Sequence, residues 1–363
     1  MYQWYLILWV FVVGLLTTSA RMLKPVKING VTEYRYTWIP VLAIALPMIY
    51  LAGTRENMGF SDTSVYKSAF QNLPSSLSGV SDYLTDEAKD KGFTYFSVFL
   101  KSIIGNEVTI YFTIIAAICI LCVVFVYKKY SCNFMMSMFL FIASADYIQW
   151  TYNGIRQFLA VAILFACAGL IMHKKYIPVI VLILLLSTIH ASALLMLPVI
   201  FIVQGKALNR KTILMLIGVL LTVTFIDQFT DVLTDIMENT QYKGEVDQYL
   251  STAGTSILRV IVYSIPAFLA LIFRRRIDAA NDSIINLSVN MSVACFSAYF
   301  LSAFSSGLFI GRIPIYFSLY NYILLPWIIE KVFTKKSSKI IYGLMIILYL
   351  IYYYYQVVLT WGI

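Results

Sequence analysis

Apolar runs long enough to cross a lipid bilayer recur along the whole chain, and they constrain its fold more than any other feature. A helix needs about 20 apolar residues to cross the hydrocarbon core. The runs that meet or approach this length are 2–20, 37–53, 107–127, 133–150, 152–172, 212–229, 256–273, 284–304, 313–330 and 340–359. Only 12% of the 363 residues are charged, whereas about a quarter are charged in a soluble domain. We therefore expect an integral membrane protein.

Two further apolar segments do not fit a single crossing. Residues 176–204 are longer than one span and have a polar break at 188–192, so we expect two short helices that fold into a hairpin. Residues 93–104 are too short to span and are expected to lie re-entrant or at the interface. Together the segments predict an all-α transmembrane bundle of about 12 spans. We expect residues 1–363 to form one membrane domain.

The lysines and arginines gather in alternate connections between the apolar runs. One set of connections holds 18 of the 27 basic residues with four acidic ones, and the other holds nine basic and fourteen acidic residues. The positive-inside rule places the first set in the cytoplasm and both termini on the external, periplasmic side. Residues 54–92 and 230–255 are then long external loops. The basic balance reflects topology, and we expect no nucleic-acid partner.

An arginine and an aspartate follow the second apolar run on its external side. Arg55 and Asp62 lie in this loop, with Tyr66 one turn further on. Ionisable residues close to a membrane are candidates for function. An arginine offers a planar fork of donors that suits phosphate oxygens, and an aspartate can take the proton of a sugar hydroxyl. The alternative is an interfacial ion pair that closes the loop.

A second arginine opens the run 152–172 from outside, within Asn153-Gly154-Ile155-Arg156-Gln157. The helix dipole disfavours a cation in the first turn of a helix. The same turn has free backbone N–H groups, so an arginine beside them makes a good anion site. A snorkelling arginine is the alternative.

The remaining external polar residues are His190 and Ser192, at the break of the expected hairpin, and Arg312, which precedes Tyr316 at the start of the run 313–330. A lone histidine is often a structural group, and tyrosines are common at membrane interfaces. The informative feature is that the arginines and His190 come from separate regions and map to one membrane face. Such a group suits a multiply charged anion, for example a pyrophosphate. Since the chain has no Cys/His set with metal-ligand spacing, we expect no metal and no cofactor.

In these residues the chain resembles the EpsG-type family, a branch of the Wzy polysaccharide polymerases. The resemblance covers most of the chain and rests, in this order, on Arg55, Gly59, Asp62 and Tyr66; on Asp90-Lys91-Gly92-Phe93; on Asn153-Gly154-Ile155-Arg156-Gln157; on His190-Ala191-Ser192; and on Arg312 before a Tyr-rich span. The Glu-Pro that usually accompanies the second segment is absent. That departure leaves the role of the segment at Asp90 open.

The resemblance implies an enzyme that joins oligosaccharide repeat units carried on undecaprenyl pyrophosphate, on the outer face of the cytoplasmic (inner) membrane. It implies a GT-C-like fold and a metal-independent, inverting glycosyl transfer. The catalytic residues would be Asp62 as general base, His190 as a base or orienting group, and Arg156. The substrate-binding residues would be Arg55, Tyr66, Asn153, Gln157, Ser192, Arg312 and Tyr316. The partners are lipid-linked oligosaccharides and membrane lipids, and the sequence leaves open whether a chain-length regulator protein takes part.

Three other functions are compatible with parts of the sequence. A ligase of the O-antigen type usually has one large late external loop, and residues 230–255 are modest for that. A transporter or flippase of lipid-linked glycans predicts repeat symmetry and polar residues on both faces. A membrane acyltransferase would use His190 as its base but leaves the arginines without a purpose. The sequence favours the polymerase, and it does not distinguish O-antigen, lipopolysaccharide, capsule or exopolysaccharide as the product.

Overall fold

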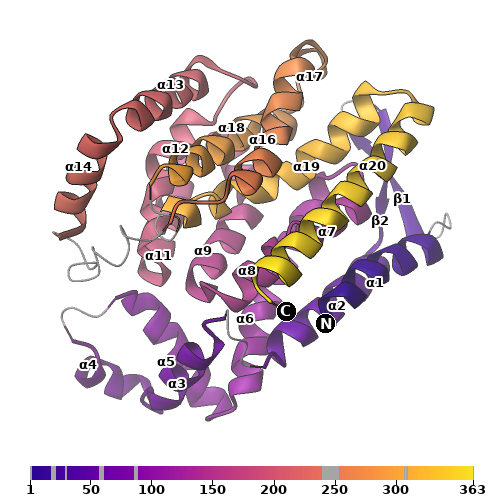
Figure 1. Cartoon of the computed structure of the whole chain (residues 1–363). Helices are drawn as coiled ribbons and strands as arrows, with labels where there is room; N and C mark the ends of the chain where they lie inside the picture. Colours follow the sequence, from indigo (N-terminus) through magenta and orange to yellow (C-terminus); the bar gives the residue numbers. More distant parts are fainter. Residues whose placement is uncertain are drawn as a thin grey trace.

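The computed structural model is a helical membrane protein with one short β-hairpin (Figure 1). The structure describes residues 2–17, 22–28, 31–56, 61–85, 89–238, 253–305, 307 and 310–362. Within these residues, three helices are long and apolar enough to cross a membrane, or up to five if each of two bent pairs is one span. The helical fold is therefore confirmed, while the count of about 12 crossings and the GT-C likeness stay predictions.

The helices follow the predicted apolar runs closely. Eight of the runs, or parts of them, form the helices α1 (Tyr2–Leu16), α2 (Trp38–Gly53), α6 (Val108–Tyr130), α9 (Ile155–Ala166), α16 (Ile257–Ile272), α18 (Ser283–Ala303), α19 (Ile315–Val332) and α20 (Lys335–Tyr354). Helix α20 continues as the π-helical turn η5 (Tyr355–Thr360). Several other runs are broken inside. The apolar pattern predicts where a helix lies, but it does not show where a neighbour interrupts it.

Two runs break where the chain turns inside the bundle. The run 133–150 forms α7 (Phe134–Ala143) and α8 (Asp146–Tyr152), because Ala145 takes the left-handed conformation at φ 66°. The run 152–172 forms α9 and α10 (Ala168–Met172). Two further pairs bend sharply: α13 (Arg210–Thr224) with α14 (Ile226–Glu238), by 102°, and α16 with α17 (Arg274–Ala280), by 72°.

The hairpin expected over residues 176–204 is confirmed. It consists of α11 (Tyr176–Ile189), the short 3₁₀ helix η3 (Ala191–Leu195) and α12 (Met196–Ile202). His190 lies at the turn with an extended backbone. The segment 93–104 is also a helix, α5 (Lys91–Ile104), preceded by α3 (Thr63–Asn72), η2 (Leu77–Gly79) and α4 (Val80–Tyr83). The region expected to be a long loop is therefore largely helical.

An antiparallel β-hairpin between α1 and α2 was not predicted. It pairs β1 (Leu23–Ile28) with β2 (Val31–Tyr36). Its signal was present, because Asn29-Gly30 separates two stretches of alternating apolar and polar residues, which is a strong hairpin pattern.

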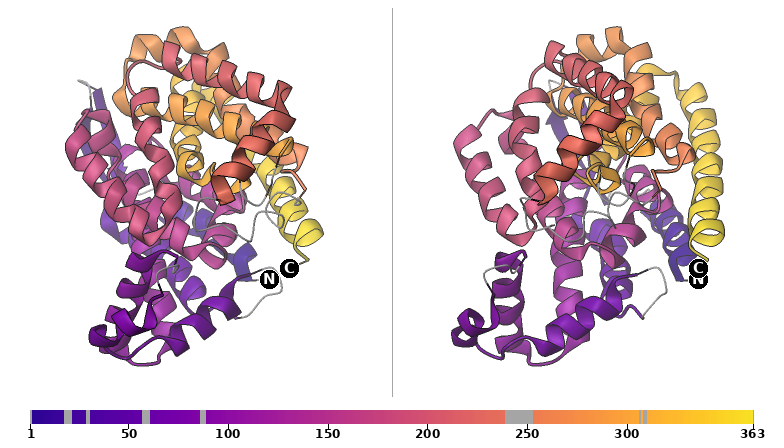
Figure 2. Two further views of the ribbon diagram at one scale, coloured as in Figure 1. Left: turned by 90° about the vertical axis from the view of Figure 1, so that its left-hand side faces the viewer. Right: turned by 60° about the vertical axis from the view of Figure 1, so that its left-hand side comes forward.

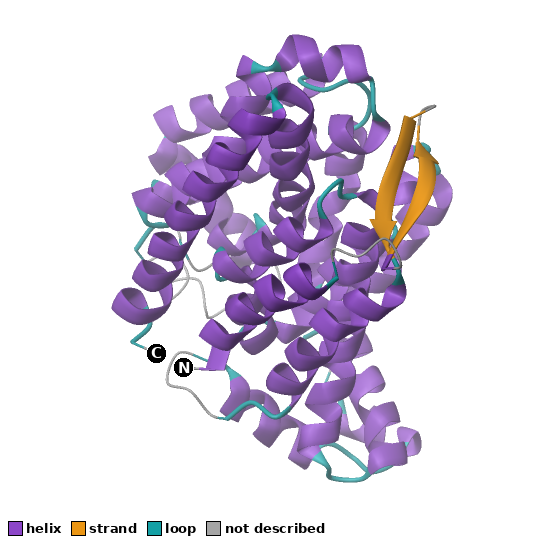
Figure 3. Cartoon of the chain, turned by 90° about the vertical axis from the view of Figure 1, so that its right-hand side faces the viewer, coloured by secondary structure: helices purple, strands orange, loops and turns teal. Residues whose placement is uncertain are grey.

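The two ends of the molecule are formed by different elements. Helices α3 to α5 lie at one end, which we call the α5 end, and α17 and the β-hairpin lie at the opposite end, which we call the basic end (Figures 1 and 2). The hairpin stands on the flank of the helices there (Figure 3). The two termini lie side by side (Figure 1). Near them the rings of Trp4 and Tyr353 meet edge to face, with their centroids 4.6 Å apart.

A buried lysine holds the α5 end together. Lys101, 5% exposed, donates from Nζ to the carbonyls of Phe70, Gln71 and Leu73, at 3.1, 2.7 and 2.7 Å. These carbonyls end α3, where backbone acceptors lack helical partners and the dipole favours a cation. Lys101 therefore fixes α3 against α5 and positions the start of α3, where the candidate site begins.

Candidate functional site

The turn that leads into α9 is built by a left-handed glycine and by the loop before α3. Gly154, at φ 61°, allows the chain to reverse just before the helix begins. The Asp62 N–H donates to Asn153 Oδ1 at 2.9 Å, and the Gly154 N–H donates to Asp62 Oδ2 at 3.3 Å. Arg156 is then the second residue of α9, as predicted. Asp62 and Asn153 therefore lie beside Arg156.

Arg156 forms an ion pair that sequence reasoning missed. Its Nη1 lies 3.0 Å from Asp90 Oδ2; the arginine side chain is 34% exposed and the aspartate side chain 6%. The other Asp90 oxygen accepts from the Ala191 N–H at 3.2 Å. Burial raises the pKa of Asp90, while Arg156 and this backbone bond oppose the rise. Asp90 thus ties Arg156 to the turn of the α11–α12 hairpin.

Aromatic rings lie against the guanidinium of Arg156. Its centre is 5.7 Å from the ring of Tyr66 and 5.9 Å from that of Phe93. Such contacts stabilise a cation by about 0.5–2 kcal/mol. Close packing brings Phe93 here, because a Cβ on Gly92 would lie 2.1 Å from Thr188 Oγ1 and 2.8 Å from its carbonyl oxygen. The glycine of the segment Asp90-Lys91-Gly92-Phe93 is therefore needed for α5 to approach α11.

Arg55 is held on the other side of the α8–α9 turn. Its Nη1 donates to the carbonyl of Thr151, and its guanidinium stacks on Phe112 at 3.9 Å and faces Tyr152 at 5.4 Å. Burial lowers the pKa of Arg55 to about 10, so it stays charged at neutral pH. Its buried Nε has no hydrogen-bond acceptor in the described part of the chain. Arg55 therefore keeps a donor for a ligand.

Gln157 joins the hairpin turn to the segment before α19. It is 2% exposed, and its Nε2 donates to Ser192 Oγ and to the carbonyl of Arg312, each at 3.2 Å. Ser192 Oγ also lies 3.0 Å from the hydroxyl of Tyr316. Arg312 lies in η4 (Ile310–Arg312). Its guanidinium makes no hydrogen bond or ion pair with any residue that the structure describes.

The hydrogen bonds of His190 define its tautomer. Nδ1 accepts from the Ser192 N–H at 3.3 Å and lies 2.7 Å from Ser192 Oγ. Burial, together with the charges of Arg156 and Arg312, lowers the pKa of His190 to about 3. The imidazole is therefore neutral, with its proton on Nε2, because Nδ1 is the acceptor. His190 offers an N–H donor to a ligand rather than a free base.

The three arginines surround one region at the α5 end. Arg55 donates to the carbonyl of Thr151 at the end of α8, and Gln157, the residue after Arg156, donates to the carbonyl of Arg312. Arg156 is therefore central, with one arginine on each side. We call the group formed by Arg55, Asp62, Asp90, Arg156, His190 and Arg312 the arginine cluster. Three cations and several N–H donors against two carboxylates suit an anion with several charges.

The structure brings the predicted site residues together, apart from one motif residue. Gly59 lies outside the described residues, as do residues 239–252 of the expected external loop 230–255. Among the described residues, no group of three or more His, Cys, Asp or Glu side chains is placed to hold a metal ion. The roles of the individual residues and the need for a metal stay predictions.

A second buried carboxylate was also missed by sequence reasoning. Asp146, 1% exposed, accepts from the hydroxyls of Tyr263 and Tyr322, the latter at 2.7 Å, and from Ser318 at 2.9 Å. The indole N–H of Trp150 donates to it at 3.3 Å. The signal was a single aspartate inside an apolar run, which is unusual at membrane depth. It lies in the core, among helices α8, α16 and α19.

Comparison with known protein families gives one match. The model of the EpsG family matches residues 38–361, which is most of the chain and includes all three arginines. No curated protein and no solved structure matches the chain. With the family match spanning helices α2 to α20 and the whole arginine cluster, the chain belongs to the EpsG family, a family of Wzy-like polysaccharide polymerases.

Proposed function

We propose that the protein polymerises oligosaccharide repeat units carried on a lipid pyrophosphate such as undecaprenyl pyrophosphate, and that the arginine cluster is its active site. The observation that carries the proposal is the convergence of three arginines around the α8–α9 turn, through the contacts of Arg55 with Thr151, of Arg156 with Asp90 and of Gln157 with the Arg312 carbonyl. The Nε of Arg55 has no acceptor among the described residues, and the guanidinium of Arg312 makes no hydrogen bond or ion pair with them. Family membership supports a polysaccharide polymerase.

The ion pair between Arg156 and Asp90 suggests how the site rests without substrate. The carboxylate stands where a phosphate oxygen would bind, at 3.0 Å from Nη1. Arg156 is one third exposed, so a ligand can reach it. A pyrophosphate carries more charge than one carboxylate and would displace it. Asp90 then acts as a counter-ion that keeps the cation in place between turnovers.

The proposed reaction is a single displacement. The hydroxyl oxygen of the incoming unit attacks the anomeric carbon of the growing chain while the bond from that carbon to the pyrophosphate oxygen breaks. The hydroxyl proton passes to a base, and the lipid pyrophosphate leaves with the bonding electron pair. The arginines stabilise the negative charge that develops on the leaving group, and such preorganised charge is usually the largest catalytic term. The anomeric centre is inverted.

Asp62 is the better candidate for the base, because among the described residues only one of its oxygens accepts a hydrogen bond, from the Gly154 N–H at 3.3 Å. Both oxygens of Asp90 have partners. His190, neutral and with its proton on Nε2, would orient a sugar hydroxyl. The proposed mechanism needs no metal, because arginines can neutralise phosphate charge.

The proposed topology places the α5 end outside the cytoplasmic membrane, with both termini external, and the basic end in the cytoplasm. The lysines and arginines of the cytoplasmic set, such as Arg274, Arg275 and Arg276 in α17, support this orientation. A reporter enzyme fused after Arg276 should be active only in its cytoplasmic form. An external signal from that fusion would overturn the orientation.

The function is tested by replacing Arg156 with Ala in cells that make the glycan. The variant should yield single repeat units instead of long chains, as seen on a glycan gel. Arg210→Ala is the matched control, because Arg210 is an exposed arginine that opens α13 outside the cluster. Normal chain lengths from Arg156→Ala, at equal protein levels, would refute the assignment. Purified protein should also polymerise in EDTA, and full inhibition would refute metal independence.

A further inference from the structure

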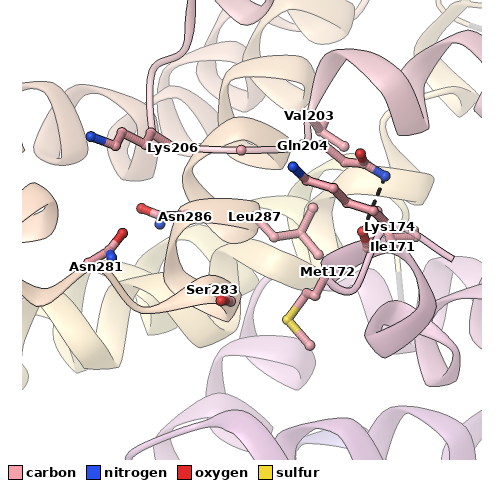
Figure 4. A pocket seen from close by; sticks show the side chains of 11 residues that line it. Ile171, Met172, Lys174, Val203, Gln204, Lys206, Asn281, Ser283, Asn286 and Leu287 are labelled. Atoms are coloured by element: carbon pink, nitrogen blue, oxygen red, sulfur yellow. Dashed lines mark hydrogen bonds between the residues drawn. The ribbon is translucent and has the colours of Figure 1, made fainter. Parts of the chain in front are cut away.

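A pocket away from the arginine cluster has no place in the proposed reaction. Its volume is about 250 Å³, and it lies where three connections meet: the turn between α10 and α11, the loop 203–206 after α12, and the start of α18 (Figure 4). The lining residues are Ile171, Met172, Lys174, Val203, Gln204, Gly205, Lys206, Asn281, Ser283, Asn286 and Leu287. The proposed mechanism uses none of them.

The charged residues in the lining are all positive. They are Lys174 and Lys206, and no Asp or Glu lines the pocket. Neither ammonium group has an ion pair or hydrogen bond with another described residue. In Figure 4 the ammonium of Lys174 points into the space between the loops, and Lys206 lies at the opposite edge, on the side of Asn281 and Asn286. The adjacent acid, Asp282, is engaged at the start of α18, where it accepts from the Ile284 N–H at 3.0 Å.

A buried amide adds a donor without a partner. Asn286 is 7% exposed, and its Oδ1 accepts from the Ala207 N–H at 3.2 Å. Because that partner is a donor, the oxygen must face it and the Nδ2 group must be the free one. Nδ2 has no acceptor among the described residues, and the side chain lines the pocket. Because the side chain lines the pocket, this Nδ2 group is available to donate to an acceptor oxygen of a ligand there.

The other amide in the wall is occupied and gives the pocket a fixed shape. Gln204 accepts from the Tyr176 hydroxyl at 2.5 Å and donates to the Ile171 carbonyl at 3.2 Å, the bond drawn in Figure 4. These bonds hold the loop 203–206 against the turn before α11. The site is therefore built before any ligand arrives.

We propose that this pocket binds the phosphate group of an anionic ligand, with Lys174, Lys206 and the amide of Asn286 as its donors. Two ammonium groups and an amide, without an opposing carboxylate, match the several acceptor oxygens of a phosphate. In a membrane protein the abundant source is the headgroup of an anionic lipid, and basic pockets between helices on the cytoplasmic side bind such headgroups. Free phosphate has the same chemistry and is the other source.

The test uses the purified full-length protein in a neutral detergent with added phosphatidylglycerol, and counts bound lipids by native mass spectrometry. The wild type should retain one phosphatidylglycerol that phosphatidylcholine does not replace. Lys174→Gln with Lys206→Gln should weaken this binding by about tenfold or more. The matched control is Lys335→Gln with Lys336→Gln, which removes the same charge from exposed positions in the first turn of α20, outside the pocket. Equal retention by the pocket and control variants would overturn the proposal.

A second variant separates loss of binding from loss of folding. Asn286→Asp keeps the acceptor for the Ala207 N–H but replaces the free donor with a carboxylate oxygen, so it should also release the lipid. Inorganic phosphate is tested in parallel by thermal unfolding. Stabilisation by phosphate that is lost in the lysine variant, without specific lipid retention, would support free phosphate as the ligand. Neither retention nor stabilisation in the wild type would refute the proposal.

Discussion

Asp90 and Asp146 are two buried carboxylates, the first paired with a charged arginine and the second with neutral donors only. Asp90 faces a guanidinium that is 34% exposed and a backbone N–H at the turn of a helical hairpin. Asp146 faces neutral donors inside the bundle, from Tyr263, Tyr322 and Ser318. The first carboxylate can exchange its partner with a ligand, because the arginine is accessible. The second cannot, because every donor around it belongs to the packed core.

The difference separates function from architecture. Asp146 opens α8 directly after the left-handed residue Ala145, so its bonds fix the break between α7 and α8. Asp90 acts in the arginine cluster, on Arg156 itself. We therefore expect a change at Asp146 to affect stability and a change at Asp90 to affect binding.

The largest effect is expected from Asp146→Ala. The change removes the acceptor of the Tyr263 and Ser318 hydroxyls and of the Trp150 indole N–H in the core, while Tyr322 keeps Ser144 Oγ at 2.7 Å, and it should destabilise the fold by about 3 kcal/mol. Thermal unfolding in detergent measures this loss. Asp146→Asn keeps an acceptor oxygen and should cost clearly less. Activity per folded molecule should be nearly unchanged, and a selective loss of activity in stable protein would break the distinction drawn above.

A smaller effect is expected from Asp90→Asn, which should increase the affinity of the arginine cluster for pyrophosphate. This change removes the charge that competes with phosphate for Arg156 while it preserves the size of the side chain. Binding of inorganic pyrophosphate, measured by calorimetry, should tighten by up to about fivefold, the worth of one charge contact near a surface. Weaker binding in the variant would show that Asp90 supports the ligand instead of competing with it. Asp278→Asn, at the basic end, is the control for net charge.

The smallest effect concerns pH. Since the pKa of His190 in the fold is about 3, the imidazole stays neutral from about pH 5 to 8, and the ratio of wild-type to His190→Asn activity should stay constant over that range. The same shift predicts that stability is lost as the pH falls from the unfolded pKa near 6.5 towards 3, because the unfolded chain binds the proton more readily. Acid unfolding of His190→Asn should show a weaker dependence over this window. An activity ratio that titrates near pH 6.5 would contradict the neutral orienting role.

The positions of the helices could be predicted from the sequence because a span needs a long apolar run. The hairpin at His190 and the start of α9 before Arg156 followed from polar breaks in such runs. The break at Ala145 could not be predicted, because it depends on the tyrosines of α16 and α19 that bond Asp146. The pattern of neighbouring residues predicts local structure, but these tyrosines are distant from Asp146 in the chain, so the pattern does not contain their contact.

The residues of the candidate site could be predicted only in part. The three arginines stood out because charge at membrane depth is rare. The pairing of Arg156 with Asp90 depends on how closely α5 packs against α11, which Gly92 permits by leaving room for Thr188. No spacing along the chain expresses that contact. The free amide of Asn286 likewise becomes visible only when the Ala207 N–H is seen to occupy its oxygen.

The most direct test of the arginine cluster is the turnover of a synthetic lipid-pyrophosphate repeat unit by purified protein, with Arg156→Ala compared in the background of Asp90→Asn. The double variant leaves no buried unpaired carboxylate, so it should fold as well as Asp90→Asn alone. We expect it to elongate chains about 100 to 1,000 times more slowly, the usual cost of losing one stabilising donor at a developing charge. Elongation at the rate of Asp90→Asn would contradict the claim that Arg156 holds the leaving pyrophosphate.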